Sequence, residues 1–417
     1  AEIAARRAEI AAERRDRKAQ QAFDAAYKLA TDGKVIAPEF VEQVSRAVAG
    51  TVYAAALPQV LNQAKEGTAF SMQPLAVQRA ILDKMAAKGN TEGWTPAEQE
   101  DYARKSASLA SAEREYADDP LRAAVERGPL QSLEPLNISS IDQLVGSVAA
   151  RRQQADQVSL VVGSAVSPLT KDEARQVGEF LNALPIQQRA PAIAQVAGAV
   201  GTAGAAALGR QIDKTDRALG LAFGYGRQMT TAGRHTSELV LKGQQAIKDK
   251  VVKVENAMET GWRAEIAGKV RGAYGNAELE QAIIESAFLI RAGLAAEGGG
   301  DAEQAVRIAA GRIVERNGSK IPLPAGWVDN QMSHALRTYP EASIRAQTAD
   351  DKVYVGGTAM DLDKFMMRLP QAPLRHAGQG RYSVMAGGGI VTNKAGQPIV
   401  LDVLNPQLPT PGGQNAR

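Results

Sequence analysis

The stretch that decides the fold is Ala277–Trp327, AELEQAIIESAFLIRAGLAAEGGGDAEQAVRIAAGRIVERNGSKIPLPAGW. Its first part repeats apolar residues at helical spacing, which predicts a helix with one broad buried face. That face comprises Ile283, Ile284, Phe288, Leu289 and Ala292. The glycine run Gly298–Gly300 is expected to end this helix.

A second helix is predicted to follow, with Asp301 as its N-cap. Its inward-facing residues are expected to be Ala305, Ile308 and Ile313. Asn317-Gly318 should then turn the chain into Ile321–Pro324, which cannot be helical because of its two prolines. The chain before this stretch is predicted to be almost entirely helical, and the chain after Trp327 to be mixed with strands.

Composition favours a mainly α protein. The chain has 417 residues and 44% apolar residues, but aromatic residues contribute only 5% and alanine is abundant. Small side chains let helices approach closely and bury little apolar surface per residue. We therefore expect stability to depend on helix length or on neighbouring subunits. The absence of cysteine from the sequence excludes disulfides and thiolate chemistry.

The net charge of +3 is too small to indicate nucleic-acid binding, but charge is unevenly distributed. Residues 92–142 hold eleven acidic and five basic side chains, whereas residues 210–271 hold seven acidic and twelve basic ones. This asymmetry suggests head-to-tail contact between copies or a basic face turned to an anionic partner; two unrelated solvated surfaces are the alternative.

We predict an extended alanine-rich helical array with a small C-terminal α+β part. The predicted regions are an N-terminal helical region (1–117), a proline-rich connector and domain boundary (118–138), a central helical domain (139–327), a mixed α/β region (328–404) and an extended tail (405–417). Because the sequence begins at Ala1, we expect it to be an excerpt or a processed product; it contains no secretory signal pattern.

The N-terminal region begins with a polar helix over 1–28. Ile3 and Ile10 repeat at seven residues, but Arg17 interrupts the third heptad, so no coiled coil is predicted. Gly33 should end this helix, and the next is predicted from Pro38 to about residue 65, with Pro58 kinking or splitting it.

Four further helices are predicted from proline positions and capping residues. They cover residues 74–88, 96–117, 139–162 and 171–184. Thr95 and Thr170 precede the second and fourth, with acidic residues in the first turn.

Residues 191–209, PAIAQVAGAVGTAGAAALG, contain no charge. Gly198, Gly201 and Gly204 are spaced for a small-residue helix face. Such a helix could enter a membrane, but strongly apolar residues are few. Tight packing inside a soluble assembly is the preferred interpretation.

The segment 236–254 places lysines beside apolar residues. The lysines are Lys242, Lys248, Lys250 and Lys253. They suggest a DNA-facing surface or a solvated amphipathic helix, and no aromatic residues lie between them as stacking platforms.

Strands are predicted after Trp327. They cover 353–355, 382–385, 390–392 and 399–403, with the last two joined as a β-hairpin through the loop 393–398.

No residue pattern indicates a metal, cofactor or nucleophile site. The three histidines, His235, His334 and His376, are far apart in sequence. The glycine runs 298–300 and 387–389 lack the strand, lysine and helix of a phosphate loop. We assign no catalytic, cofactor-binding or metal residue and expect no cofactor.

One local motif resembles an enzyme. Ile283-Ile284-Glu285-Ser286 is similar to the helix-borne Glu-Ser of soluble lytic transglycosylases, in which the glutamate is the general acid and base. The Gly-Leu-Met-Gln segment of that family is replaced here by Gly293-Leu294-Ala-Ala-Glu.

Residues 170–327 as a whole resemble the internal virion, or ejection, proteins of short-tailed bacteriophages. The matching segments are 184–190 (LPIQQRA), 237–245 (SELVLKGQQ) and 317–327 (NGSKIPLPAGW). Some proteins of this type carry a transglycosylase domain elsewhere in the chain.

The resemblance implies a structural protein stored in the capsid interior, beside portal and other ejection proteins. It would leave ahead of the genome, enter the host periplasm and envelope, and assemble as a homo-oligomeric tunnel around double-stranded DNA, bound without sequence preference. A peptidoglycan-cleaving transglycosylase using Glu285 and a generic helical scaffold or adaptor are the alternatives.

Overall fold

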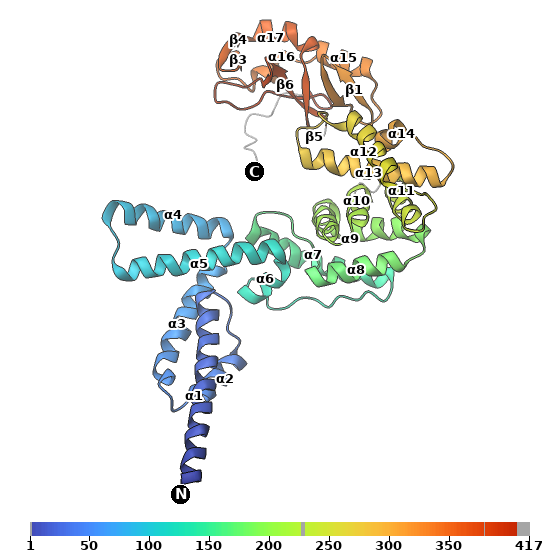
Figure 1. Cartoon of the computed structure of the whole chain (residues 1–417). Helices are drawn as coiled ribbons and strands as arrows, with labels where there is room; N and C mark the ends of the chain where they lie inside the picture. The colour runs from blue at the N-terminus through green and yellow to red at the C-terminus, as the bar shows by residue number, and fades with distance from the viewer. Residues whose placement is uncertain (1, 227–229, 379, 407–417) are drawn as a thin grey trace. The chain divides into compact units, whose positions relative to one another are not determined.

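The computed structural model describes residues 2–226, 230–378 and 380–406 (Figure 1). The chain divides into two compact units, Ala1–Arg234 (unit 1) and His235–Arg417 (unit 2). The predicted fold class is confirmed, because helices dominate and a small set of antiparallel strand pairs lies near the C-terminus.

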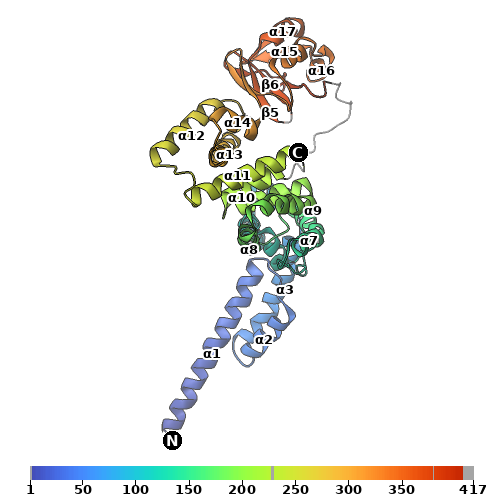
Figure 2. The same cartoon turned by 90° about the vertical axis from the view of Figure 1, so that its right-hand side faces the viewer.

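In the part of unit 1 that the structure describes, every regular element is a helix. These are α1 (Glu2–Thr31), α2 (Pro38–Val48), α3 (Tyr53–Ser71), α4 (Leu75–Glu92), α5 (Pro96–Asp118), α6 (Pro120–Arg127), α7 (Ile141–Val162), α8 (Lys171–Ala183), α9 (Ile186–Asp213) and α10 (Arg217–Gly226). Figure 2 shows α1 running alongside α2 and α3, which it contacts.

The predicted helix starts are confirmed at the caps of α5 and α8. The Thr95 hydroxyl accepts the backbone N–H of Glu98, whose carboxylate accepts the N–H of Thr95 in return. Thr170 and Glu173 form the same reciprocal pair at the start of α8. Both boxes satisfy backbone donors that the helix itself leaves unpaired.

The single helix predicted from Pro38 to about residue 65 is wrong. The chain forms α2 and α3, separated at residues 49–52, where Gly50 has a φ of 73°. Glycine adopts this left-handed conformation without steric cost, so the helix ends there. Pro58, which was expected to cause the break, lies inside the continuous helix α3.

Gly33 ends α1 as predicted, and the structure gives it a second role. Its φ is 67° and a Cβ at this position would lie 2.0 Å from the Ser71 Oγ and 2.6 Å from the Ser108 Oγ. The end of α1 therefore meets α3 and α5 at a distance that excludes any side chain.

The segment 118–138 is not an irregular connector throughout, because it contains α6. Leu121 and Leu130 share one buried cluster with Leu109 of α5 and Val158 of α7. Residues before and after the segment therefore belong to one core, and the division between compact units falls after Arg234 instead. Pro120 begins α6, whereas Pro129 and Pro135 lie in the irregular chain that follows it.

Helix α9 contains the uncharged stretch 191–209. By length and composition it is the one described helix that would suit a membrane span, and half of its most apolar window is buried inside the protein. Gly198 is exposed, and Gly201 interrupts the helical conformation with a φ of 73°. The predicted small-residue face of Gly198, Gly201 and Gly204 is therefore wrong. Packing uses Ile193, Val196, Leu208 and their neighbours instead.

Unit 2 combines a helical part with short strands. The helices are α11 (Thr231–Lys248), whose first turn still belongs to unit 1, α12 (Asn256–Val270), α13 (Ala277–Ala296), α14 (Ala302–Ala310), α15 (Asp329–Arg337), α16 (Glu341–Arg345) and α17 (Leu362–Arg368), with a 3-10 turn η1 (Leu369–Gln371). The strands are β1 (Ile313–Arg316), β2 (Ser319–Pro322), β3 (Lys352–Val355), β4 (Thr358–Asp361), β5 (Leu374–Gly378), β6 (Arg381–Ala386), β7 (Gly389–Ile390) and β8 (Val400–Asp402).

The deciding stretch forms α13, α14 and a β-hairpin. Asp301 caps α14 as predicted, accepting the backbone N–H of Gln304 at 2.7 Å. Ile313 lies in β1 and not on the helix, because Gly311 ends α14 with a φ of 78°. Strands β1 and β2 pair through the two-residue turn Asn317-Gly318, both of positive φ. Asn-Gly between two strands is the strongest short hairpin signal, so the turn expected here is the turn of a β-hairpin.

The C-terminal strands gather on β6. Strands β5 and β8 pair with one end of β6, and β7 pairs with its other end across Gly387-Gly388. The predicted hairpin around 393–398 is present next to its loop: Thr392 and Pro398 form an antiparallel bridge, the Ile399 N–H donates to the Val391 carbonyl at 2.9 Å, and the Asn393 N–H donates to the Gln397 carbonyl at 2.8 Å. The residues that follow, in β8, pair with β6 and not with β7.

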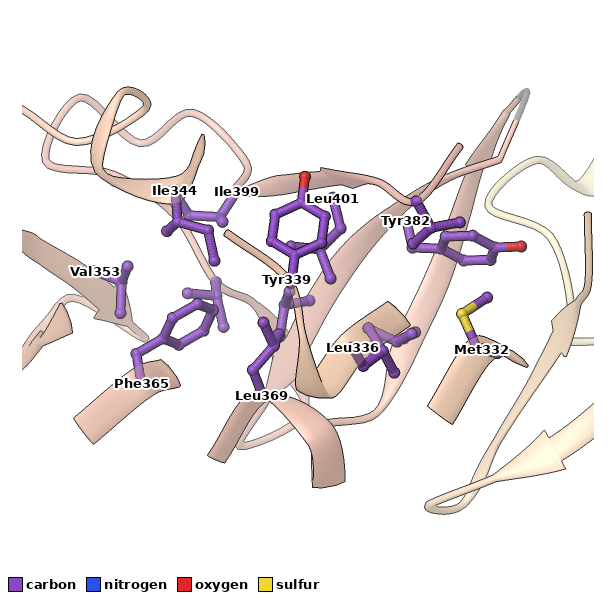
Figure 3. Packing of buried hydrophobic residues seen from close by; sticks show 14 of the residues in the cluster. Met332, Leu336, Tyr339, Ile344, Val353, Phe365, Leu369, Tyr382, Ile399 and Leu401 are labelled. Carbon is purple, nitrogen blue, oxygen red and sulfur yellow. The ribbon is translucent and has the colours of Figure 1, made fainter. Parts of the chain in front are cut away.

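Figure 3 shows the core beneath these strands, in which side chains of α15, α17 and η1 meet those of β6 and β8. The Tyr382 hydroxyl donates to the Pro322 carbonyl at 2.6 Å, and the Tyr339 hydroxyl accepts the N–H of Asp402 at 3.0 Å. Hydrogen bonds thus join β6 to β2, and the segment between α15 and α16 to β8, in addition to apolar contact.

Two predictions concern residues outside this description. The side chains of Ile3 and Ile10 and the tail residues 407–417 lie outside the described residues.

Candidate anion-binding site

Unit 2 contains a cavity of about 540 Å³ between α12, α13 and β2. The lining residues are Arg263, Ala264, Ala267, Gly268, Arg271, Gln281, Ile284 and Lys320. Three of these are cations and none is acidic. A cavity of this size is in the range of small-ligand pockets, which are typically about 300–1,000 Å³.

One helix face supplies most of the wall. Ala264, Ala267, Gly268 and Arg271 recur at the three- and four-residue spacing that places side chains on one side of α12. The small residues leave the space open, and a Cβ at Gly268 would have no atom within 4 Å. The cavity therefore exists because α12 carries alanine and glycine where it faces β2.

Arg263 is held in place before any ligand arrives. Its Nε donates to the Glu259 carboxylate at 2.8 Å, and its guanidinium lies 4.2 Å from the centre of the Phe288 ring. On the same helix pair, Arg291 of α13 lies 4.4 Å from the Trp262 ring and pairs with Glu265 at 2.7 Å. These cation–π contacts join α12 to α13 and fix the wall of the cavity.

The other two cations differ in their partners. The Lys320 ammonium donates to the Gly268 carbonyl, which leaves further N–H donors on the same nitrogen. No hydrogen bond or ion pair within the described chain engages the exposed Arg271 guanidinium. Arg271 and Lys320 thus have N–H donors at the cavity that form no hydrogen bond within the described chain.

The predicted basic segment of α11 is only partly available. Lys242 pairs with Glu238 and Glu297, each at 2.9 Å, and these hydrogen bonds raise its pKa. Lys248, Lys250 and Lys253 are exposed at the end of α11 and in the loop that follows, and no described carboxylate lies within 4 Å of them. Three of the four predicted lysines therefore remain as a solvent-facing group.

Glu285 and Ser286 point to different surroundings. Glu285 is half-buried and accepts a hydrogen bond from Gln281 at 3.0 Å. Ser286 is buried, and its hydroxyl donates to the Ala282 carbonyl within the helix. Glu285 lies outside the cavity lining, although its neighbours Gln281 and Ile284 belong to it.

The histidines lie in three separate places. His235 and His334 are exposed on α11 and α15. His376 of β5 packs edge-on against Tyr274 and Tyr382, at ring distances of 5.1 and 5.6 Å, and burial lowers its pKa. Among the described residues no group of three or more histidines or carboxylates is arranged to hold a metal ion.

The two glycine runs connect regular elements in the structure. Gly298 and Gly300 have φ angles of 90° and 96° between α13 and α14, and Gly387 and Gly388 lie between β6 and β7. The cavity cations, by contrast, share no local motif. Arg263 and Arg271 belong to the basic stretch 210–271, and Lys320 follows the Asn317-Gly318 turn.

No protein-family model, curated protein or solved structure matches this chain.

Proposed function

We propose that this chain is an internal virion protein of a short-tailed bacteriophage that serves a structural role in genome delivery. In this proposal it is stored in the capsid with portal and other ejection proteins, enters the host envelope and assembles with copies of itself into a tunnel for double-stranded DNA. The sequence resemblance over 170–327 and the mainly helical fold support the proposal.

The observation that carries the DNA contact is the group of three exposed lysines at residues 248, 250 and 253. They lie within one short segment and have no carboxylate partner among the described residues. Cations of this kind bind the phosphate backbone without reading sequence, and they do so by releasing counterions. A protein through which a whole genome passes requires contacts that do not depend on base sequence.

The first experiment measures the oligomeric state of the purified full chain, by light scattering followed by single-particle imaging. The proposal predicts closed rings or tubes whose opening admits duplex DNA, which requires roughly 20 Å, given that the major groove alone is about 12 Å wide. A chain that stays monomeric with and without duplex DNA over a wide concentration range would contradict assembly as its own property.

The second experiment measures binding to a duplex of mixed sequence by fluorescence anisotropy at several salt concentrations. Lys248, Lys250 and Lys253 are replaced together by glutamine. Each lost phosphate contact should reduce the slope of log affinity against log salt by roughly 0.9, so a reduction of about 2 to 3 is expected.

The matched control removes the same charge from unit 1 by replacing Lys18, Lys65 and Lys84 with glutamine. These lysines are also exposed and form no ion pair among the described residues. Equal losses in both triple variants would show that binding follows net charge alone and would overturn the assignment of this surface.

A further inference from the structure

The cavity between α12, α13 and β2 has one sign of charge. Arg263 of α12, Arg271 at the end of α12 and Lys320 of β2 all belong to its lining, and no carboxylate does. We propose that this cavity binds a phosphate monoester carried on a small organic body. The inference goes beyond the proposed function and does not depend on it.

The cations suit the three outer oxygens of a phosphate monoester. Arg271 presents a guanidinium that no described residue engages, and guanidinium groups match phosphate with two parallel hydrogen bonds. Lys320 is anchored to the Gly268 carbonyl and can add a further donor. Because Arg263 is fixed by Glu259 and Phe288, little side-chain entropy is lost when an anion binds beside it.

The rest of the lining suits the organic body. Ala264, Ala267 and Ile284 offer an apolar wall, and the Gln281 amide can donate or accept one hydrogen bond. The volume of about 540 Å³ exceeds the requirement of an inorganic ion and matches a small ligand. A bare phosphate ion would leave this wall unused and should bind more weakly.

The test is titration calorimetry of the full chain with thymidine 5′-monophosphate as the probe, beside thymidine and inorganic phosphate. The nucleotide should bind more tightly than phosphate, and thymidine should not bind. Because the second ionisation of a phosphate monoester lies near pH 6, affinity should fall when the pH is lowered from about 7.5 to about 5.5.

Two variants remove charge from the site. Arg271→Gln and Lys320→Gln should each weaken nucleotide binding by roughly tenfold or more, since each removes a charge-assisted hydrogen bond. Lys394→Gln is the matched control, because Lys394 is exposed in the loop before β8 and is absent from the cavity lining. It should leave the affinity unchanged.

A third variant fills the cavity without altering its charge. Gly268→Leu adds a side chain where a Cβ meets no atom within 4 Å, so the helix should tolerate it. The variant should lose nucleotide binding without a lower unfolding temperature, because leucine is a better helix former than glycine. This separates blocked access from a folding defect.

Two sources could supply the same phosphate group, a free nucleotide or the 5′ end of DNA. A short duplex with a 5′-phosphate is therefore compared with the same duplex ending in a 5′-hydroxyl. Tighter binding of the phosphorylated duplex, lost in Gly268→Leu, would assign the site to DNA ends, and binding of the mononucleotide alone would assign it to free nucleotides. The inference is overturned if neither binds at millimolar concentration, or if both bind equally well to Gly268→Leu.

Discussion

Gly243 of α11 and Gly293 of α13 lie against each other, and neither position has room for a side chain. A Cβ at Gly243 would come within 1.8 Å of the Leu289 carbonyl oxygen, and one at Gly293 within 2.6 Å of the Leu239 carbonyl oxygen. The two helices therefore meet at backbone contact. Small residues at a crossing allow this approach.

Replacing Gly243 with alanine should destabilise unit 2. The new methyl group would meet backbone atoms, which cannot rotate away. The expected loss of folding free energy is therefore about 3 kcal/mol, at the upper end of the usual range for overpacking. Calorimetry of the full chain measures the effect as a lower unfolding temperature.

Gly268→Ala is the control. It lies on helix α12 with open space around its Cβ and should stabilise by about 0.5–1 kcal/mol. Equal effects of the two variants would contradict the predicted close approach.

Substitution of Arg127 should destabilise unit 1 more than most other substitutions. Its side chain is fully buried, and it donates to the Glu115 carboxylate at 2.8 Å and to the Asp32 carbonyl at 2.9 Å. Arg127→Met removes both hydrogen bonds and leaves Glu115 paired with Lys34 alone, which should cost roughly 1.5–3 kcal/mol. Arg122→Met removes an exposed pair with Glu126 and should cost far less, because solvent screens such pairs. Urea unfolding of both variants compares them, and similar costs would refute the role of burial.

Acid should weaken the ion pair between Arg127 and Glu115. Burial raises the pKa of Glu115, but hydrogen bonds from Arg127 and Lys34 outweigh it and hold the pKa below its ordinary value of 4.5. Because the folded pKa lies below the unfolded one, this stabilisation is present above about pH 4.5 and is lost as the pH falls through the folded pKa.

The measurement is the free energy of unfolding of unit 1, followed in urea between about pH 7 and about pH 3. The wild-type chain should lose stability below about pH 4.5. Glu115→Gln should be less stable at neutral pH and lose less in acid, because the substituted amide does not titrate. A variant with the same acid dependence as the wild type would show that other carboxylates dominate.

Tyr382 should contribute through its hydroxyl as well as its ring. The buried hydroxyl donates to the Pro322 carbonyl, and burial raises its pKa, so it stays neutral and keeps the donor. Tyr382→Phe leaves that buried carbonyl without this donor and should cost about 1–2 kcal/mol in thermal or urea unfolding of unit 2. Tyr354→Phe removes a more exposed hydrogen bond to Asp350 and should cost less than half as much. A larger loss in Tyr354→Phe would contradict this ranking.

Local chemistry explains which elements the sequence predicted. Thr95, Thr170 and Asp301 cap helices where expected, because a capping side chain needs only neighbours three residues away. The strands predicted at 353–355 and 382–385 correspond to β3 and β6. The break at Gly50 in place of Pro58 was missed because both residue types interrupt helices, and local sequence does not rank them.

The candidate site could not be predicted in the same way. Arg263 and Lys320 are separated by many residues, and the β1–β2 hairpin that carries Lys320 was expected only as a turn. Gly268 does not indicate a cavity in the sequence either. A glycine inside a helix is unfavourable by itself, and only the structure shows that it borders open space.

The sequence by itself determined the helical character of this protein, the helix caps and the small C-terminal set of strands, because these depend on spacing, side-chain chemistry and backbone conformation within a few residues. Tertiary structure alone decided where the chain divides, that Gly243 meets Gly293, and that three cations of unit 2 line one cavity. These features depend on the packing of side chains that are distant in sequence, and packing is settled only when the whole core forms.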